Sequence, residues 1–200
     1  MTTQAGRLRI IAGDLRGRRI AVPPSGTRPM ADRVRESLFA ILEPRLAGAH
    51  VADLCAGSGA IGIEALSRGA DHVTLIERSR EAVSIIQANL ATLQLSERAT
   101  VVSGDVLAAL GESAIVFDLI VADPPYDDVA LADGILARCA VAGGPLGSSG
   151  LLALTGRTRP KGHPRALPEG LRCVRTLTYG ESCVDLLEHD RDAELEGDDE

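Results

Sequence analysis

The sequence lacks the features that mark membrane proteins, secreted proteins and metalloproteins. Its 200 residues are 45% hydrophobic and 24% charged, which is ordinary for a globular chain. No apolar run is long enough to cross a bilayer, and no basic start followed by a continuous apolar core opens the chain. The four cysteines form no C-x-x-C pair and the four histidines form no ligand cluster. We therefore expect one compact cytoplasmic domain with reduced thiols and no metal.

A glycine-rich loop follows the first apolar strand, which we predict from His50 to Leu54. The loop consists of Cys55, Ala56, Gly57, Ser58 and Gly59, and a predicted helix follows it from about Ile61 to Arg68. Glycines let a ligand approach the backbone, whose N–H groups can bind it. Together with Gly62 the loop also fits the pattern G-x-G-x-x-G, so the spacing alone does not exclude a nicotinamide-binding turn.

Acidic residues follow the next two predicted strands. The strand from His72 ends at Glu77, 18 positions after Gly59, where a dinucleotide or a nucleoside would place its ribose hydroxyls. The strand from Ala99 to Ser103 is followed by Gly104 and Asp105, and the Asp105 carboxylate could bind an adenine edge. Each acid also has a simpler interpretation, since Glu77 could begin a helix and Asp105 could cap one.

A fourth strand, predicted from Phe117 to Ala122, runs directly into Asp123-Pro124-Pro125-Tyr126. Two consecutive prolines lack N–H donors and must end the strand. The corner would present the Asp123 carboxylate and the Pro124 carbonyl oxygen as acceptors, with the Tyr126 ring as a stacking surface. This arrangement favours methylation of a planar amine. An ordinary turn in which Asp123 caps the next helix is the alternative.

The order of these four loops resembles the class I S-adenosylmethionine-dependent methyltransferases. Ligands collect at the carboxyl ends of parallel strands in open α/β sheets. The resemblance implies an α/β, Rossmann-like fold with a mostly parallel seven-stranded sheet flanked by helices, and S-adenosylmethionine as cofactor. It implies Asp123, Pro124 and Tyr126 as catalytic residues. The implied cofactor contacts are Asp53, Cys55, Ala56, Gly57, Ser58, Gly59, Glu77, Arg78, Gly104, Asp105 and Val106.

The N-terminal region narrows this resemblance. It contains, in order, Arg-Ile-Ile-Ala-Gly, Arg-Gly-Arg and Arg-Pro-x-x-Asp-Arg-x-Arg-Glu. With Asp-x-x-Ala-Gly-Ser-Gly and Asp-Pro-Pro-Tyr, this series is similar to the RsmD-type 16S ribosomal RNA guanine-N2 methyltransferases from about Arg7 to Glu188. The family implies methylation of a guanine N2 in 16S rRNA on assembled small subunits. A DNA adenine-N6 or cytosine-N4 methyltransferase and a NAD-binding oxidoreductase remain as alternatives.

Charge divides the chain into three parts. The formal net charge is −7, but residues 190–200 hold seven acids and one arginine, whereas residues 1–45 hold nine arginines and four acids. We expect residues 1–27 to form an RNA-contacting β-hairpin extension, residues 28–189 the methyltransferase domain of a monomer, and residues 190–200 a disordered acidic tail. The expected phosphate contacts are Arg16, Arg18, Arg19, Arg28, Arg33 and Arg35.

Overall fold

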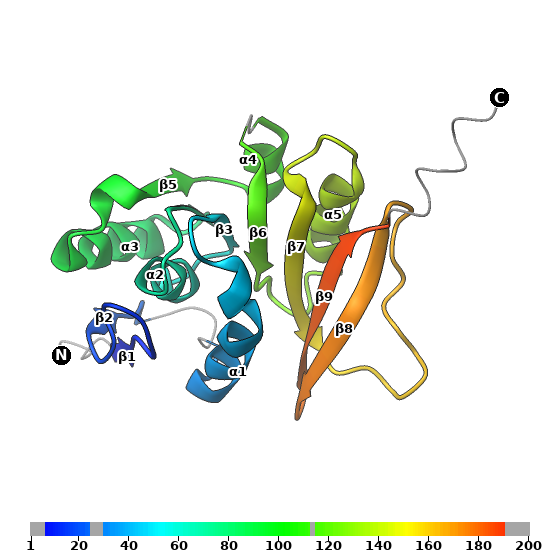
Figure 1. The fold of residues 1–200 in the computed structure, drawn as a ribbon, viewed down its shortest axis with the longest axis horizontal. Coiled ribbons are helices and arrows are strands. Elements are labelled where there is room, and N and C mark those ends of the chain that lie inside the picture. The colour runs from blue at the N-terminus through cyan, green and yellow to red at the C-terminus, as the bar shows by residue number, and fades with distance from the viewer. Residues whose placement is uncertain (1–6, 25–29, 113–114, 191–200) are drawn as a thin grey trace.

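A seven-stranded sheet forms the centre of the molecule (Figure 1). The computed structural model describes residues 7–24, 30–112 and 115–190. The strands of the sheet are β3 (His50–Leu54), β4 (His72–Glu77), β5 (Ala99–Ser103), β6 (Phe117–Ala122), β7 (Leu146–Arg157), β8 (Leu171–Tyr179) and β9 (Ser182–His189). They lie in the order β5-β4-β3-β6-β7-β9-β8, and β9 runs opposite to the other strands of the sheet. The expected mostly parallel, Rossmann-like sheet is confirmed.

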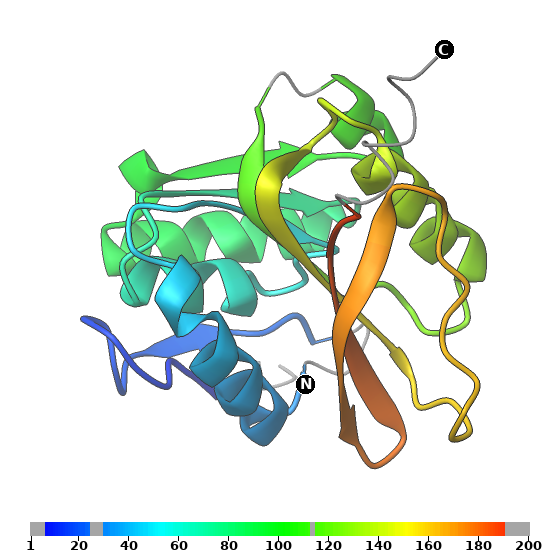
Figure 2. The ribbon, with the colours of Figure 1, turned by 45° about the vertical axis from the view of Figure 1, so that its right-hand side comes forward.

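Helices cover both faces of this sheet (Figure 2). They are α1 (Asp32–Leu42), α2 (Ala60–Ser67), α3 (Arg80–Leu93), α4 (Val106–Glu112) and α5 (Val129–Ala140), with short 3-10 turns at Glu43–Arg45 and Ser96–Arg98. One apolar core holds side chains of α1, α2 and α3, and the other holds side chains of α4 and α5. Strands buried on both faces explain the continuous apolar runs in the sequence. None of the described helices has the length and apolar character needed to cross a membrane.

The N-terminal segment forms a separate two-stranded hairpin of β1 (Arg7–Arg9) and β2 (Arg19–Ala21), which are antiparallel. The chain between these strands is fixed to the end of α2, because Asp14 N donates to the Ser67 carbonyl at 2.8 Å and Leu15 N donates to Ser67 Oγ at 3.0 Å. Gly13 lies in this turn with a φ of +78°, and a Cβ there would be 1.8 Å from the Ser67 oxygen. Only glycine fits this close approach.

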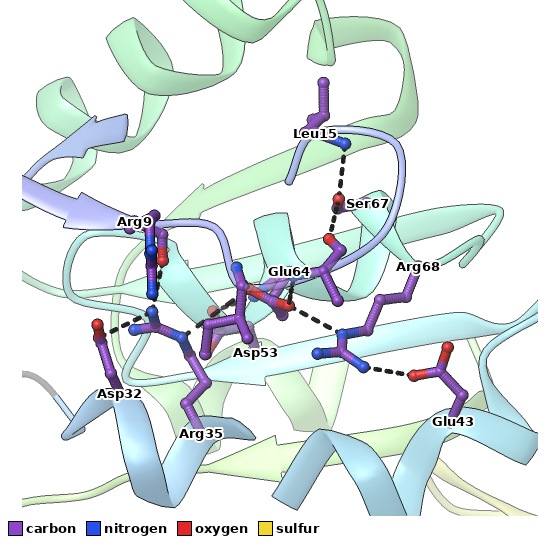
Figure 3. A network of polar contacts seen from close by, with 12 residues as sticks. Arg9, Leu15, Asp32, Arg35, Glu43, Asp53, Glu64, Ser67 and Arg68 are labelled. Atoms are coloured by element: carbon purple, nitrogen blue, oxygen red, sulfur yellow. Dashed lines mark hydrogen bonds and ion pairs between the residues drawn. The ribbon is translucent and has the colours of Figure 1, made fainter. Parts of the chain in front are cut away.

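The buried carboxylate of Glu64 anchors the hairpin to α2 (Figure 3). Glu64 is 1% exposed and accepts hydrogen bonds from Ile11 N at 2.8 Å and Ala12 N at 3.0 Å. Arg68 Nε donates to it at 2.8 Å, and Arg35 Nε lies 4.0 Å from its other oxygen. These donors and charges offset the cost of burying a carboxylate.

Removal of this carboxylate should loosen the hairpin and destabilise the domain. We expect Glu64→Ala to lower the free energy of unfolding by about 3–5 kcal/mol, because it removes the acceptor of two backbone N–H groups and the carboxylate that faces two largely buried guanidinium groups. Urea unfolding measures this loss, and hydrogen exchange at Ile11 and Ala12 reports the hairpin. Glu43→Ala is the matched control, since Glu43 also pairs with Arg68 but its side chain is 55% exposed. Equal losses in the two variants would contradict the anchoring role.

Candidate active site

A cavity of about 500 Å³ lies at the carboxyl ends of the parallel strands, within the size range of small-molecule sites. The loops after β3, β4, β5 and β6 line it, and so do residues of the N-terminal region. The expected cofactor residues that line it are Asp53, Cys55, Ala56, Gly57, Ser58, Glu77, Arg78, Asp105 and Val106. Gly59 and Gly104 do not line the cavity. The topology thus brings the four loops singled out in the sequence to one site.

The loop after β3 owes its shape to left-handed backbone conformations. Cys55, Gly57 and Gly59 have φ values of +63°, +58° and +76°. A Cβ on Gly57 would meet no atom within 4 Å, so the backbone faces open space, whereas a Cβ on Gly59 would lie 3.1 Å from Leu75. Gly57 therefore allows ligand approach, and Gly59 allows packing against the sheet.

The surroundings of two residues, Cys55 in this loop and Asn89 beside it, indicate what each one does. Burial raises the pKa of the Cys55 thiol to about 12, and the Glu77, Asp53 and Asp123 charges add to the effect, so the thiol stays protonated and is a poor nucleophile. Asn89 on α3 donates to the Ser58 carbonyl at 3.0 Å and exchanges two hydrogen bonds with the backbone of Ala21 on β2. One amide therefore connects the glycine loop with the hairpin.

The carboxylates of Asp53 and Glu77 hold the glycine-rich loop and its helix by hydrogen bonds, and they make the wall of the cavity acidic. Asp53 accepts from Gly62 N at 2.9 Å, and Glu77 accepts from Gly57 N at 2.9 Å and from Ser79 N at 2.8 Å. Burial raises the pKa of Asp53 well above its usual range, the Gly62 hydrogen bond opposes this, and the charges of Asp123 and Glu77 raise it further. A cationic ligand would relieve the repulsion among these carboxylates.

Asp105 caps a helix and also lines the cavity. Its Oδ1 accepts from Ala108 N at 2.9 Å and its carbonyl accepts from Ala109 N at 3.0 Å, so the residue caps α4. The same residue lines the cavity beside Val106 and Leu107. A capping role therefore does not remove Asp105 from the site.

The corner after β6 places a carboxylate in the cavity. Thr155 Oγ1 on β7 donates a short hydrogen bond to Asp123 Oδ1. Burial raises the pKa of Asp123, and the Thr155 hydrogen bond partly opposes that rise. Asp128, rather than Asp123, caps α5 by accepting from Leu131 N at 3.1 Å. The capping alternative for Asp123 is therefore wrong.

The other corner residues differ in their surroundings. Pro125 lines the cavity with Asp123, whereas Pro124 is buried. Tyr126 is 39% exposed, and its hydroxyl lies 3.1 Å from Ser182 Oγ on β9. The ring is thus accessible and attached to the β8–β9 edge of the sheet. Asp128, Ala130 and Leu131 also line the cavity, and no sequence signal beyond their position just after the corner indicated them.

The predicted phosphate contacts do not form one class. Of the six predicted arginines, Arg16, Arg18, Arg19 and Arg33 are exposed on the hairpin and on α1, and Arg28 lies outside the described residues. The prediction for Arg35 is wrong, because this side chain is 1% exposed. Its Nη2 donates to the Arg9 carbonyl at 2.7 Å and to Asp32 at 3.1 Å. The Glu64 carboxylate lies 4.0 Å from Arg35 Nε, so the buried guanidinium also faces a buried charge of opposite sign.

Comparison with known proteins places the chain in a family. The family model described as Conserved hypothetical protein 95 matches residues 8–188. The chain belongs to this family. This membership confirms the resemblance to RsmD-type proteins drawn from the motifs.

Several similar proteins are named as methyltransferases. Ribosomal RNA small subunit methyltransferase D of Escherichia coli K12 is 44% identical over 123 residues, which are 61% of this chain and 62% of that protein. The match thus spans about three fifths of the curated relative. The solved structure of Escherichia coli yhhF, assigned as a methyltransferase, has a TM-score of 0.81 at 34% identity and covers 92% of this chain and 99% of its own. A hypothetical protein from Thermus thermophilus has a TM-score of 0.73 at 32% identity, covering 90% and 99%.

The Thr155 hydroxyl should hold the Asp123 carboxylate in its ionised form. Thr155→Val removes the donor and leaves burial unopposed, so we expect the pKa of Asp123 to rise further. As the pH is lowered, Asp123 of the variant would then be protonated at a higher pH than Asp123 of the unaltered protein. Titration of the Asp123 carboxyl carbon by NMR measures this, with Asp123→Asn to assign the signal. Thr155→Ser keeps the hydroxyl and should titrate like the unaltered protein; equal shifts in both variants would contradict the role of the hydroxyl.

Proposed function

We propose that this protein transfers a methyl group from S-adenosylmethionine to the exocyclic N2 of a guanine in 16S ribosomal RNA, within the small ribosomal subunit. The observation that carries the proposal is that a single cavity joins the loops after β3, β4 and β5 with the Asp123–Pro125 corner. A cofactor site and an acceptor site therefore share one space. The names of the family's curated relatives support the choice of RNA over DNA.

The lining residues fit S-adenosylmethionine. The open backbone at Gly57 suits the methionine part, Glu77 lies where ribose hydroxyls need an acceptor, and Asp105 suits the adenine amino group. Mutual repulsion of Asp53, Glu77 and Asp123 favours a ligand with positive charge. When bound, this cofactor supplies an electrophilic methyl group on a positively charged sulfur.

The corner after β6 would orient the acceptor. The guanine amino lone pair is delocalised into the ring, so the amine reacts better when Asp123 and the Pro124 carbonyl accept its hydrogens and direct the nitrogen at the methyl group. The exposed Tyr126 ring would stack on the base and offset part of the cost of unstacking it. The methylated nitrogen loses its proton readily, and the raised pKa of Asp123 makes this carboxylate a suitable acceptor.

The N-terminal hairpin would hold the RNA. The exposed residues Arg16, Arg18, Arg19 and Arg33 lie on the hairpin and on α1, and they would bind phosphates without reading sequence. We assign residues 1–27 to this RNA-contacting extension and residues 28–189 to the methyltransferase domain of a cytoplasmic monomer. Residues 191–200, most of the expected acidic tail, lie outside the described residues.

A labelled methyl group distinguishes the possible acceptors. Purified small subunits that lack the modification, naked 16S rRNA and duplex DNA are incubated with the protein and labelled S-adenosylmethionine, and the nucleosides are analysed by mass. We expect N2-methylguanosine from the subunits. Label in DNA alone would overturn the substrate, and cofactor binding without transfer to any of the three would overturn the acceptor class.

Asp123 should act on the acceptor and not on the cofactor. We expect Asp123→Ala to lower single-turnover methyl transfer by at least about 10²-fold, the scale of losing a positioned polar contact in the transition state, and to leave cofactor affinity nearly unchanged. Calorimetry measures the affinity. Asp127→Ala is the matched control, because Asp127 lies in the same corner but its side chain is 87% exposed and pairs with Arg157. Loss of both properties together in Asp123→Ala would contradict this division of roles.

A further inference from the structure

The loop that follows β7 forms a second cavity, of about 290 Å³, against the β8–β9 hairpin. Arg159, Lys161 and His163 line it from the loop, and Thr176 and Thr178 line it from β8. Among the described residues of its wall, none is acidic and none has a large apolar side chain. The second cavity shares no lining residue with the cavity at the glycine-rich loop. A basic wall with hydroxyl groups suits a phosphate and not an apolar ligand.

A buried carboxylate holds the arginines of this loop in place. Asp185 on β9 is 1% exposed and accepts two hydrogen bonds from Arg159 Nη2, at 2.6 and 2.7 Å. It also accepts one from Arg165 Nε at 3.1 Å and one from Thr176 Oγ1 at 2.8 Å. A single carboxylate balances the charge of one guanidinium, so the two arginines together keep a positive charge. The loop therefore has a fixed shape and a positive potential.

Lys161 is the uncommitted cation of the second cavity. It is exposed, and within the described part of the chain its ammonium has no hydrogen bond and no ion pair. His163 and Thr178 are exposed on the same wall. Ammonium and hydroxyl groups are frequent donors to phosphate oxygens. Lys161 is also the one lysine of the sequence, so a reagent for side-chain amines reports on this cavity.

The loop is attached to the corner that would hold the acceptor base. Arg157, the last residue of β7, pairs with Asp127 of the corner at 2.9 Å. The Tyr126 hydroxyl lies 3.1 Å from Ser182 Oγ at the start of β9. Thr158 ties the loop to the β8–β9 turn, because its N and its Oγ1 each donate to a carbonyl of the turn at 2.8 Å. The second cavity begins one residue further along the chain and so adjoins the corner.

The sheet places this loop and the N-terminal hairpin on opposite sides of the corner. The hairpin is bonded to α2 and α3, which pack on β3, β4 and β5. The strands β7, β9 and β8 lie beyond β6 in the other direction. In Figure 1 the hairpin lies to the left of β6 and the loop to its right. An RNA strand that crosses the corner would therefore have phosphates on both sides.

We propose that the second cavity binds a backbone phosphate of the RNA beside the target guanine, with Lys161 as the contacting cation; this rests on the proposed function. The Thr178 hydroxyl supplies a further donor, and Arg159, held by Asp185, adds positive charge. Phosphate contacts of this kind fix the position of the RNA without reading its sequence. The hairpin and the loop would then hold the strand on both sides of the base that enters the active site.

The alternative is a solvated loop whose arginines only tie it to Asp185. Labelling of Lys161 with an amine-reactive ester separates the two roles. The full chain is labelled alone, with small ribosomal subunits that lack the modification, and with large subunits, and the Lys161 peptide is quantified by mass spectrometry. With small subunits at about ten times the dissociation constant, we expect the labelling rate to fall about tenfold, because only the free protein reacts. Large subunits should have little effect.

Substitution tests whether Lys161 contacts a phosphate. We expect Lys161→Gln to raise the KM for small subunits about 2–5-fold, the scale of an exposed ion pair, and to reduce the slope of log KM against log salt by about one. Arg172→Gln is the matched control and should change neither value. Arg172 is also basic and exposed, but it lies at the start of β8, which runs parallel to β7, and so at the edge of the sheet away from the corner.

Three results would overturn the inference. Unchanged labelling of Lys161 in the presence of subunits that the protein methylates would do so and leave the proposed function standing. Protection of Lys161 with an unchanged salt slope in Lys161→Gln would also do so, because the RNA would then cover the loop without a phosphate contact. An unaltered protein that neither bound nor methylated small subunits would overturn the proposed function together with this inference.

Discussion

The architecture of the site depends on one buried carboxylate. Glu64, on the helix that follows the glycine loop, accepts two backbone N–H groups of the hairpin and lies between two arginines. Without it the hairpin would keep its hydrogen bonds to Ser67 and Asn89 but lose the acceptor of Ile11 and Ala12. Val22, Pro23 and Met30, which follow the hairpin in the chain, line the cavity. A structural interaction therefore forms one wall of the functional site.

Another part of the cavity wall carries three carboxylates that repel one another. Parallel strands end at one edge of the sheet, and this chain places Asp53, Glu77 and Asp123 there together. Their charges raise the pKa of Asp53, which burial has already raised. Such crowding lowers the stability of the empty domain, and proteins retain it where a ligand of opposite charge offsets it. The cost of the arrangement is consistent with a cationic cofactor.

The parallel half of the sheet could be predicted because each strand is a short apolar run ended by a loop signal. The strands β3, β4, β5 and β6 begin and end where the sequence indicated, and the residues after them line the cavity. Helix α3 was missed, although Ser79 caps it and Val83 and Ile86 follow at helical spacing. The burial of Arg35 could not be predicted, because the Arg9 carbonyl and the Glu64 carboxylate that face its guanidinium are distant in sequence and give no local signal.

The Asn89 amide, which bonds to both the hairpin and the glycine loop, makes the two regions thermodynamically linked. A ligand that displaces the hairpin must also disturb the loop that faces the cavity. Linkage is reciprocal, so occupancy of the cavity changes the affinity of whatever binds the hairpin by the same factor as the reverse. A ligand at the hairpin and a ligand in the cavity would therefore not bind independently of each other.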